Sequence, residues 1–75
     1  MMQAVVITSG SDRDRVLKLY SEDGFLGLIS GIRGLERTRT ESSFDGTWLY
    51  KVRMADGSVH IYLWLRPEEI RERWS

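Results

Sequence analysis

Apolar and polar residues alternate most clearly in the C-terminal half of the chain. Two apolar-rich runs, Trp48–Met54 and Val59–Leu65, flank the segment Ala55-Asp56-Gly57-Ser58. Asp-Gly between such runs is typical of a β-hairpin, because a two-residue turn of the primed type needs positive φ at both central positions. The pattern therefore predicts an antiparallel hairpin over 47–65 with Asp56 and Gly57 at the centre of its turn.

This register sorts the hairpin side chains onto two faces. One face pairs apolar residues with each other and predicts the core, which comprises Trp48, Tyr50, Val52, Met54, Val59, Ile61, Leu63 and Leu65. The opposite face pairs Leu49 with Trp64, Lys51 with Tyr62 and Arg53 with His60. Because the core is already filled, the apolar pair Leu49 and Trp64 needs a cover from a partner, a ligand or another subunit. The alternative is a solvated outer surface on which Lys51 lies across Tyr62.

A second hairpin is predicted at Asp23-Gly24, where Val16–Tyr20 would pair with Phe25–Ile29. The alternative for this region is a helix over 12–22 with Ser11 as its N-cap and Gly24 as its stop. We favour the strand.

The remaining segments predict bends, a loop and a terminal turn. Gly27, Gly31 and Gly34 are too closely spaced for a stable helix and suit bulges where a strand bends sharply. Residues 36–45 are polar and indicate a long loop, and Pro67 followed by two acids starts a short helical turn. The expected fold is all-β, a closed or nearly closed barrel of about five strands with a C-terminal helical turn. The alternative is an α+β fold with the 12–22 helix on an antiparallel sheet.

Size and composition limit what such a chain can carry. Its 75 residues make one domain, 1–75, with a core that supplies only a small net stability. There is no Cys and a single His, His60, so one chain can build neither a disulfide framework nor a Cys/His metal site. Oligomerisation is the remaining means of support, and we expect a homo-oligomer or a protein partner, with no metal and no cofactor.

Charge makes nucleic acid a weaker prediction. Eleven basic and eleven acidic side chains give a formal net charge of zero, which is not the electrostatic footprint of a DNA- or RNA-binding protein. Arg33, Arg37 and Arg39 form a local basic segment that could follow a phosphate backbone, but we favour a solvated loop as its explanation. The sequence shows no export signal and no membrane span, so we expect a cytoplasmic protein.

Two segments carry a resemblance to a known family. The spacing Tyr50-x-Val52-x-Met54-x-Asp56-Gly57, followed by Pro67-Glu68-Glu69-Ile70, looks like small barrels of the Src-homology-3 (SH3) type. Within that group, Gly57-Ser58-Val59-His60-Ile61-Tyr62 resembles the Gly-Ser-Val-Gln-Ile-Tyr strand of the plasmid-borne type II dihydrofolate reductases. Asp14-Arg15-Val16-Leu17-Lys18 resembles their Asp-Arg-Val-Arg-Lys segment. The likeness covers roughly residues 14–70, and because that family is plasmid-borne, it implies a mobile genetic element as the source.

The resemblance implies an enzyme that acts only as a tetramer, because four chains of that family surround one pore that holds folate and NADPH. By this likeness, Lys18 would attract the carboxylate tail of the substrate, the Ile61 backbone would contact the nicotinamide amide, and Tyr62 would line the pore. His60 stands where the family has its pore-lining Gln.

Three functions follow from these observations. The leading one is a binding or interaction module that self-associates or docks a partner through Leu49, Lys51, Arg53, His60, Tyr62 and Trp64. The first alternative is a reductase-like enzyme that uses Lys18, His60, Ile61 and Tyr62 with NADPH. The second is a nucleic-acid-binding barrel that uses Arg33, Arg37 and Arg39.

Overall fold

The prediction of an all-β fold is confirmed. The structure is a computed structural model that describes residues 2–8, 15–39 and 45–74. In these ranges the regular elements are six strands and one short 3₁₀ turn, η1 (Pro67–Glu69). The strands are β1 (Gln3–Thr8), β2 (Arg15–Ser21), β3 (Gly24–Arg37), β4 (Trp48–Met54), β5 (Val59–Leu65) and β6 (Ile70–Trp74). No described helix is long and apolar enough to cross a membrane.

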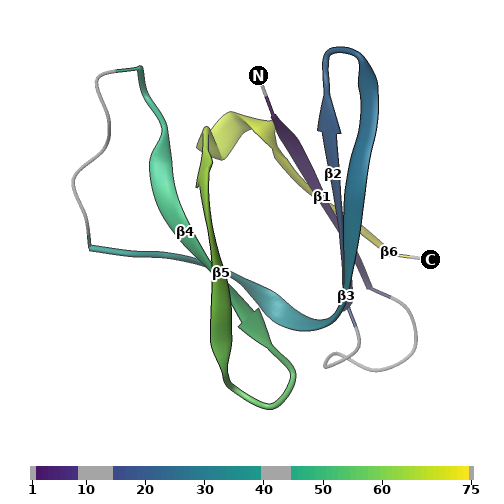
Figure 1. The fold of residues 1–75 in the computed structure, drawn as a ribbon, viewed down its shortest axis with the longest axis vertical. Coiled ribbons are helices and arrows are strands. Elements are labelled where there is room, and N and C mark those ends of the chain that lie inside the picture. The colour runs from purple at the N-terminus through teal and green to yellow at the C-terminus, as the bar shows by residue number, and fades with distance from the viewer. Residues whose placement is uncertain (1, 9–14, 40–44, 75) are drawn as a thin grey trace.

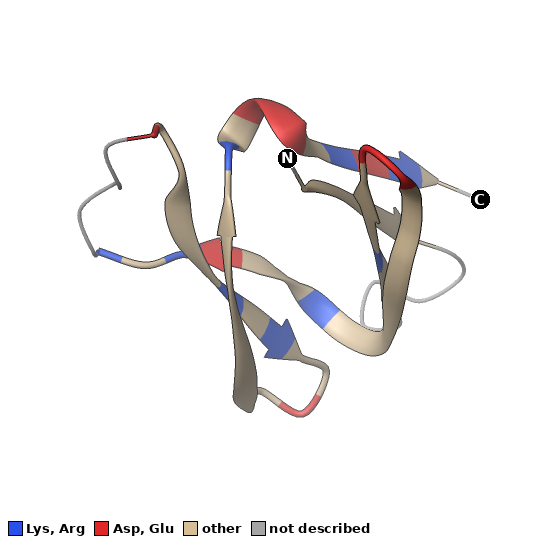
Figure 2. Cartoon of the chain, turned by 45° about the horizontal axis from the view of Figure 1, so that its top comes forward, with Lys and Arg blue, Asp and Glu red and all other residues tan. Residues whose placement is uncertain are grey.

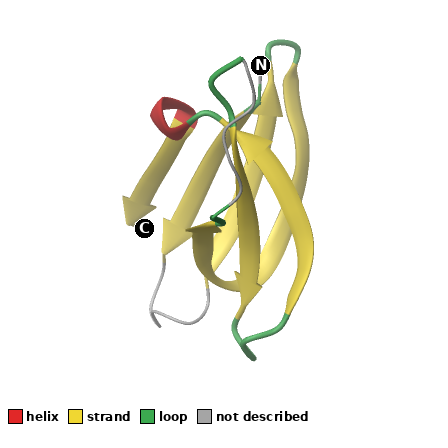
Figure 3. Ribbon diagram, turned by 90° about the vertical axis from the view of Figure 1, so that its left-hand side faces the viewer, coloured by secondary structure: helices red, strands yellow, loops and turns green. Residues whose placement is uncertain are grey.

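All six strands belong to one curled sheet in the order β5-β4-β3-β2-β1-β6. Figure 1 shows β3 curving across the molecule from β2 to β4. Neighbouring strands are antiparallel except β1 and β6, which run side by side in the same direction (Figure 3). η1 carries the chain from the end of β5 to β6, which pairs only with β1, so β5 and β6 remain the two edges of the described sheet. The described part of the structure has six strands where about five were predicted, and of the two forms expected, a closed or a nearly closed barrel, the described sheet is the one that is not closed.

Two of the glycines predicted at bends, Gly31 and Gly34, lie at or beside bulges of β3. Gly31 has a φ of 68° and is an extra residue on β3, because Arg15 pairs with Ile32 while Val16 pairs with Ser30. A second register shift, between Ile32 and Gly34, occurs where β3 pairs with β4. These bulges allow one strand of fourteen residues to contribute to both halves of the curled sheet.

The core lies on the inner side of the curl and draws on five strands. Its buried hydrophobic residues are Ala4, Val6, Leu17, Ile32, Tyr50, Val52 and Leu65. Three of these come from the predicted core face of the hairpin, and Trp48, Met54, Ile61 and Leu63 of that face pack against them while partly exposed. The described part also leaves six large apolar side chains exposed: Phe25, Leu26, Leu28, Tyr62, Trp64 and Trp74.

Two of the interpretations of the elements are corrected and one is confirmed. Residues 15–21 form strand β2, so the helix alternative is wrong there, and 12–14 lie outside the described residues. Glu36 and Arg37 belong to β3 rather than to the predicted loop, of which 40–44 lie outside the described residues. The predicted short C-terminal turn is present as η1, after which residues 70–74 form β6 and pair with β1.

Both predicted hairpins form, but their turns differ from the expected geometry. The Met54 N–H donates to the Ser58 carbonyl and the Gly57 N–H donates to the Met54 carbonyl, both at 2.9 Å. The turn therefore spans Ala55 to Gly57, and only Gly57 has positive φ, at 89°. A type I turn followed by glycine in the left-handed region explains this, since Asp56 then avoids positive φ. In the other hairpin Ser21 pairs with Gly24, so the turn residues are Glu22 and Asp23.

Candidate interaction face

The outer side of β4 and β5 carries the residues predicted to bind a partner. We call this set the hairpin face: Leu49, Lys51, Arg53, His60, Tyr62 and Trp64. The predicted pairs Leu49 with Trp64 and Lys51 with Tyr62 are present. Arg53 pairs with Val59 instead of His60, because a register shift after Val52 leaves His60 as an extra residue on β5. The predicted pairing of Arg53 with His60 is therefore wrong.

Two large aromatic side chains dominate the exposed part of this face. Tyr62 is 55% exposed and Trp64 is 48% exposed, whereas their inward-facing neighbour Leu65 is 1% exposed. Leu49 and Lys51 are half-buried beside them on β4. Burial along β5 thus alternates strictly, and the aromatic rings stand on the side that the core does not use.

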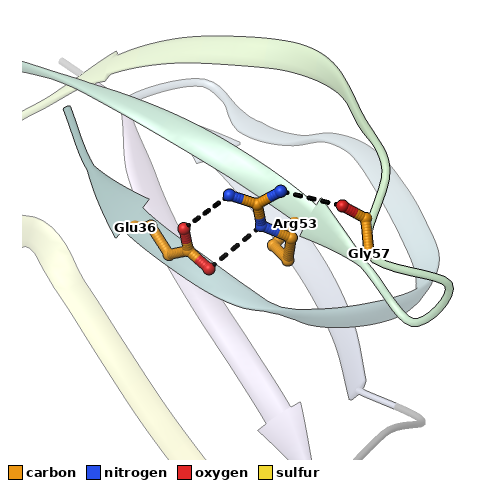
Figure 4. A network of polar contacts seen from close by, with 3 residues as sticks. All are labelled: Glu36, Arg53 and Gly57. Carbon is orange, nitrogen blue, oxygen red and sulfur yellow. Dashed lines mark hydrogen bonds and ion pairs between the residues drawn. The ribbon is translucent and has the colours of Figure 1, made fainter.

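Arg53 is engaged within the chain and braces the hairpin. Its Nε and Nη2 donate to the two carboxylate oxygens of Glu36 at 3.1 and 3.0 Å, and its Nη1 donates to the Gly57 carbonyl at 2.8 Å (Figure 4). Hydrogen bonding from Arg53 lowers the pKa of Glu36 below its usual value. Lys51 pairs directly with Glu36 across the β3–β4 ladder. The positive charges of Lys51 and Arg53 are therefore balanced in part by the carboxylate of Glu36, a residue that the sequence pattern had predicted in a loop.

The turn beside the face is fixed by a carboxylate and a hydroxyl. Asp56 accepts hydrogen bonds from the Ser58 N–H at 2.8 Å and from the Ser58 hydroxyl at 2.5 Å. The Ser58 hydroxyl bond is the main cause of a lowered pKa for Asp56. His60 is exposed next to this turn. These contacts are those of a structural turn, as predicted for Asp56-Gly57.

Two hydrogen bonds at opposite ends of β4 show in which direction the backbone N–H and C=O groups of this strand point. Thr38 N–H donates to the Leu49 carbonyl, and Ala55 N–H donates to the Gly31 carbonyl, both at 2.9 Å. Leu49 and Ala55 therefore point their backbone groups toward β3. Because these directions alternate along an antiparallel strand, the intervening even-numbered residues of β4 point toward β5.

The same alternation fixes the directions on β5. Tyr50 and Val52 meet Leu63 and Ile61, whose backbone groups point back into the β4–β5 ladder. Tyr62 and Trp64 therefore direct both N–H and C=O toward the open edge of the described sheet. Tyr62 and Trp64 thus combine exposed rings with backbone groups that face no other described strand.

The reductase-like residues are not brought together within one chain. Lys18 lies on β2, paired with Val5 and Leu28, and lines a shallow pocket of ≈ 270 Å³ formed by β1, β2 and β6. His60, Ile61 and Tyr62 lie on β5, with β3 and β4 between the two sets. Only an assembly of several chains could combine them.

The three arginines of the basic segment do not form one patch. Arg33 donates to the Ala55 carbonyl at 3.1 Å, just beyond one end of β4, while the Arg37 guanidinium lies 4.2 Å from the Trp48 ring centre at the other end. Arg39 is exposed beyond β3. Figure 2 shows basic residues spread over several strands, with acidic residues at the β2–β3 turn, on η1 and at other places between them. Within the described residues, Arg33 and Arg37 thus lie at opposite ends of β4.

A pocket of ≈ 380 Å³ opens on the inner side of the curl, lined in part by Arg15, Arg33 and Glu72. Arg15 donates to the Thr8 hydroxyl at 3.0 Å and to the Arg33 carbonyl, so its guanidinium serves the fold. The described residues contain no group of three or more His, Cys, Asp or Glu able to hold a metal ion.

Comparison with known proteins does not assign the chain to a family. The sequence matches no protein-family model, no curated protein and no solved structure. The function is therefore inferred from the hairpin face itself.

Proposed function

We propose that this chain is a small all-β interaction module that associates with a second copy of itself through the hairpin face. The observation that carries the proposal is the pair of half-exposed aromatic side chains, Tyr62 and Trp64, side by side on an edge strand. Tyr and Trp in such positions are the residues that most often dominate the energy of protein interfaces.

Three further features support a second copy as the occupant. The chain has a formal net charge of zero, so two copies do not repel each other strongly. Lys51 and Arg53 lie beside Glu36 of the same chain, which lowers the cost of covering the face. The small buried core also leaves a domain of this size in need of additional apolar contacts.

The experiment compares the same substitution at two exposed tryptophans, one on the hairpin face and one on the opposite edge strand. Trp64→Glu puts a charge on the hairpin face, whereas Trp74→Glu puts the same charge on β6, where Trp74 is 76% exposed. Native mass is measured by light scattering over a range of protein concentrations, and circular dichroism reports whether each variant stays folded. Removing an interface aromatic of this kind costs about 2 kcal/mol or more, roughly a thirtyfold weaker association.

The expected result is that the unchanged chain and Trp74→Glu associate, while folded Trp64→Glu is a monomer. A Trp64→Glu variant with the mass of the unchanged chain would contradict the proposal. The same measurement with NADPH tests the reductase-like alternative, since a tetramer that binds NADPH would favour that function instead.

A further inference from the structure

We infer that two copies pair edge to edge through β5, antiparallel about a two-fold axis at Leu63, so that Tyr62 of each copy faces Trp64 of the other. This inference rests on the proposed self-association and specifies which atoms carry it. A second copy is singled out as the occupant because it offers the same unpaired strand with matching donors and acceptors.

The two edges of the sheet differ in how they are protected. β6 carries Arg71, Glu72 and Arg73, and charged side chains of this kind are a common guard against edge-to-edge pairing. Along β5, residues 61–65 read Ile-Tyr-Leu-Trp-Leu, with no charge and no proline. Features that hinder edge-to-edge pairing occur only near the ends of β5. They are the bulge at His60 and Pro67, which follows the strand. The unguarded stretch is the part that we expect a second chain to cover.

The direction of the backbone groups restricts the register. Tyr62 and Trp64 point their N–H and C=O groups outward, so an antiparallel partner must place its own outward residues opposite them. A two-fold axis at Leu63 satisfies this, because Tyr62 then faces Trp64 of the second copy on both sides of the axis. Each facing pair exchanges both N–H···O bonds.

The two neighbouring registers would form fewer backbone hydrogen bonds. An axis at Tyr62 would pair Trp64 with His60, where the bulge disturbs the strand. An axis at Trp64 would pair Tyr62 with Arg66, whose carbonyl already accepts the Glu69 N–H at 2.9 Å. The register about Leu63 uses both outward residues and avoids both obstacles.

Side chains in this register are also complementary. Tyr62 and Trp64 of opposite copies lie next to each other on the outer side, where cross-strand aromatic pairs stabilise a sheet. On the inner side, Leu63 meets Leu63 of the second copy as a non-hydrogen-bonded pair, in which side chains are closest. The dimer thus extends each sheet and covers the exposed rings at the same time.

Cysteine cross-linking tests the register directly, because the chain has no cysteine of its own. The register predicts that Leu63→Cys oxidises to a covalent dimer. Ser30→Cys is the matched control, since Ser30 is exposed on β3 and lies away from the β5 edge. A mixture of Tyr62→Cys and Trp64→Cys should form the mixed disulfide, whereas each alone should form little. Both side chains are exposed, so this pair also serves if Leu63→Cys folds poorly.

Native mass separates the possible outcomes. Twice the 8.7 kDa of one chain, together with cross-linking of Leu63→Cys and of the mixture, supports the inference. A dimer that cross-links no better than Ser30→Cys, or that forms Tyr62→Cys or Trp64→Cys homodimers in preference to the mixed one, overturns the register while leaving self-association intact. A monomer overturns both proposals.

Discussion

Two glycines of β3 provide a test of the bend that shapes the sheet. Gly31 has a φ of 68°, while Gly34 lies three residues further along the strand with φ outside the positive region. A Cβ added at either position would meet no other heavy atom within 4 Å. The two positions therefore offer similar space and differ in backbone conformation. Replacing each glycine by alanine isolates the cost of that conformation.

Both substitutions restrict the unfolded chain equally, which favours folding by about 0.4–1 kcal/mol where the native φ is compatible. Gly31→Ala additionally places a Cβ in the left-handed region, at a cost of roughly 1–2 kcal/mol. We expect the free energies of unfolding of the two variants to differ by about this amount, with Gly31→Ala the less stable. In a domain of this size the difference corresponds to roughly 4–8 °C in Tm for each kcal/mol.

Urea denaturation at one fixed protein concentration measures the difference without a contribution from changing association. Gly31→Asn is a useful third variant, because asparagine tolerates the left-handed region better than alanine. It should fall between the other two in stability. Equal stability of Gly31→Ala and Gly34→Ala would refute the assignment of Gly31 as the bulge residue that needs positive φ.

Two other predictions concern burial and pH. Leu17→Ala removes a fully buried side chain from β2 and should lower the free energy of unfolding by about 2–5 kcal/mol, whereas Leu28→Ala, at a position 51% exposed on β3, should cost clearly less in the same urea titration. Asp56 has a lowered pKa in the folded chain, so its contribution to stability is present above the pKa of the unfolded chain and is lost as pH falls through the folded value. The stability lost on Ser58→Ala should therefore be full at neutral pH and shrink below about pH 4; a difference that stays constant to low pH would argue against the Asp56 contact.

Local patterns predicted the strands and the faces of the main hairpin, because alternation with period two is decided by neighbouring residues. The pairs Leu49 with Trp64 and Lys51 with Tyr62 were predictable in this way. The bulge at His60 was not, since it depends on the turn that the Met54, Gly57 and Ser58 backbone groups adopt.

Long-range pairing accounts for the other differences. Pro67, Glu68 and Glu69 are residues that typically start a helix. Residues 70–74 nevertheless form strand β6, because they make hydrogen bonds with β1. Glu36 was predicted in a polar loop, and only the extension of β3 beside β4 brings it to Arg53. The Arg53–Glu36 contact of the candidate site was therefore beyond the reach of local sequence patterns.

The parallel pairing of β6 with β1 has a consequence for the order of events during synthesis. β1 is made before the other described strands, yet Ala4 finds its β6 neighbour only when Ile70 has been added. Until then the apolar strand Ala4–Ile7 presents an unpaired edge on the side away from β2. Closing so long a loop is slow compared with forming the β4–β5 hairpin. Nascent chains that stop before residue 70 should therefore be the ones most exposed to chaperone capture and aggregation.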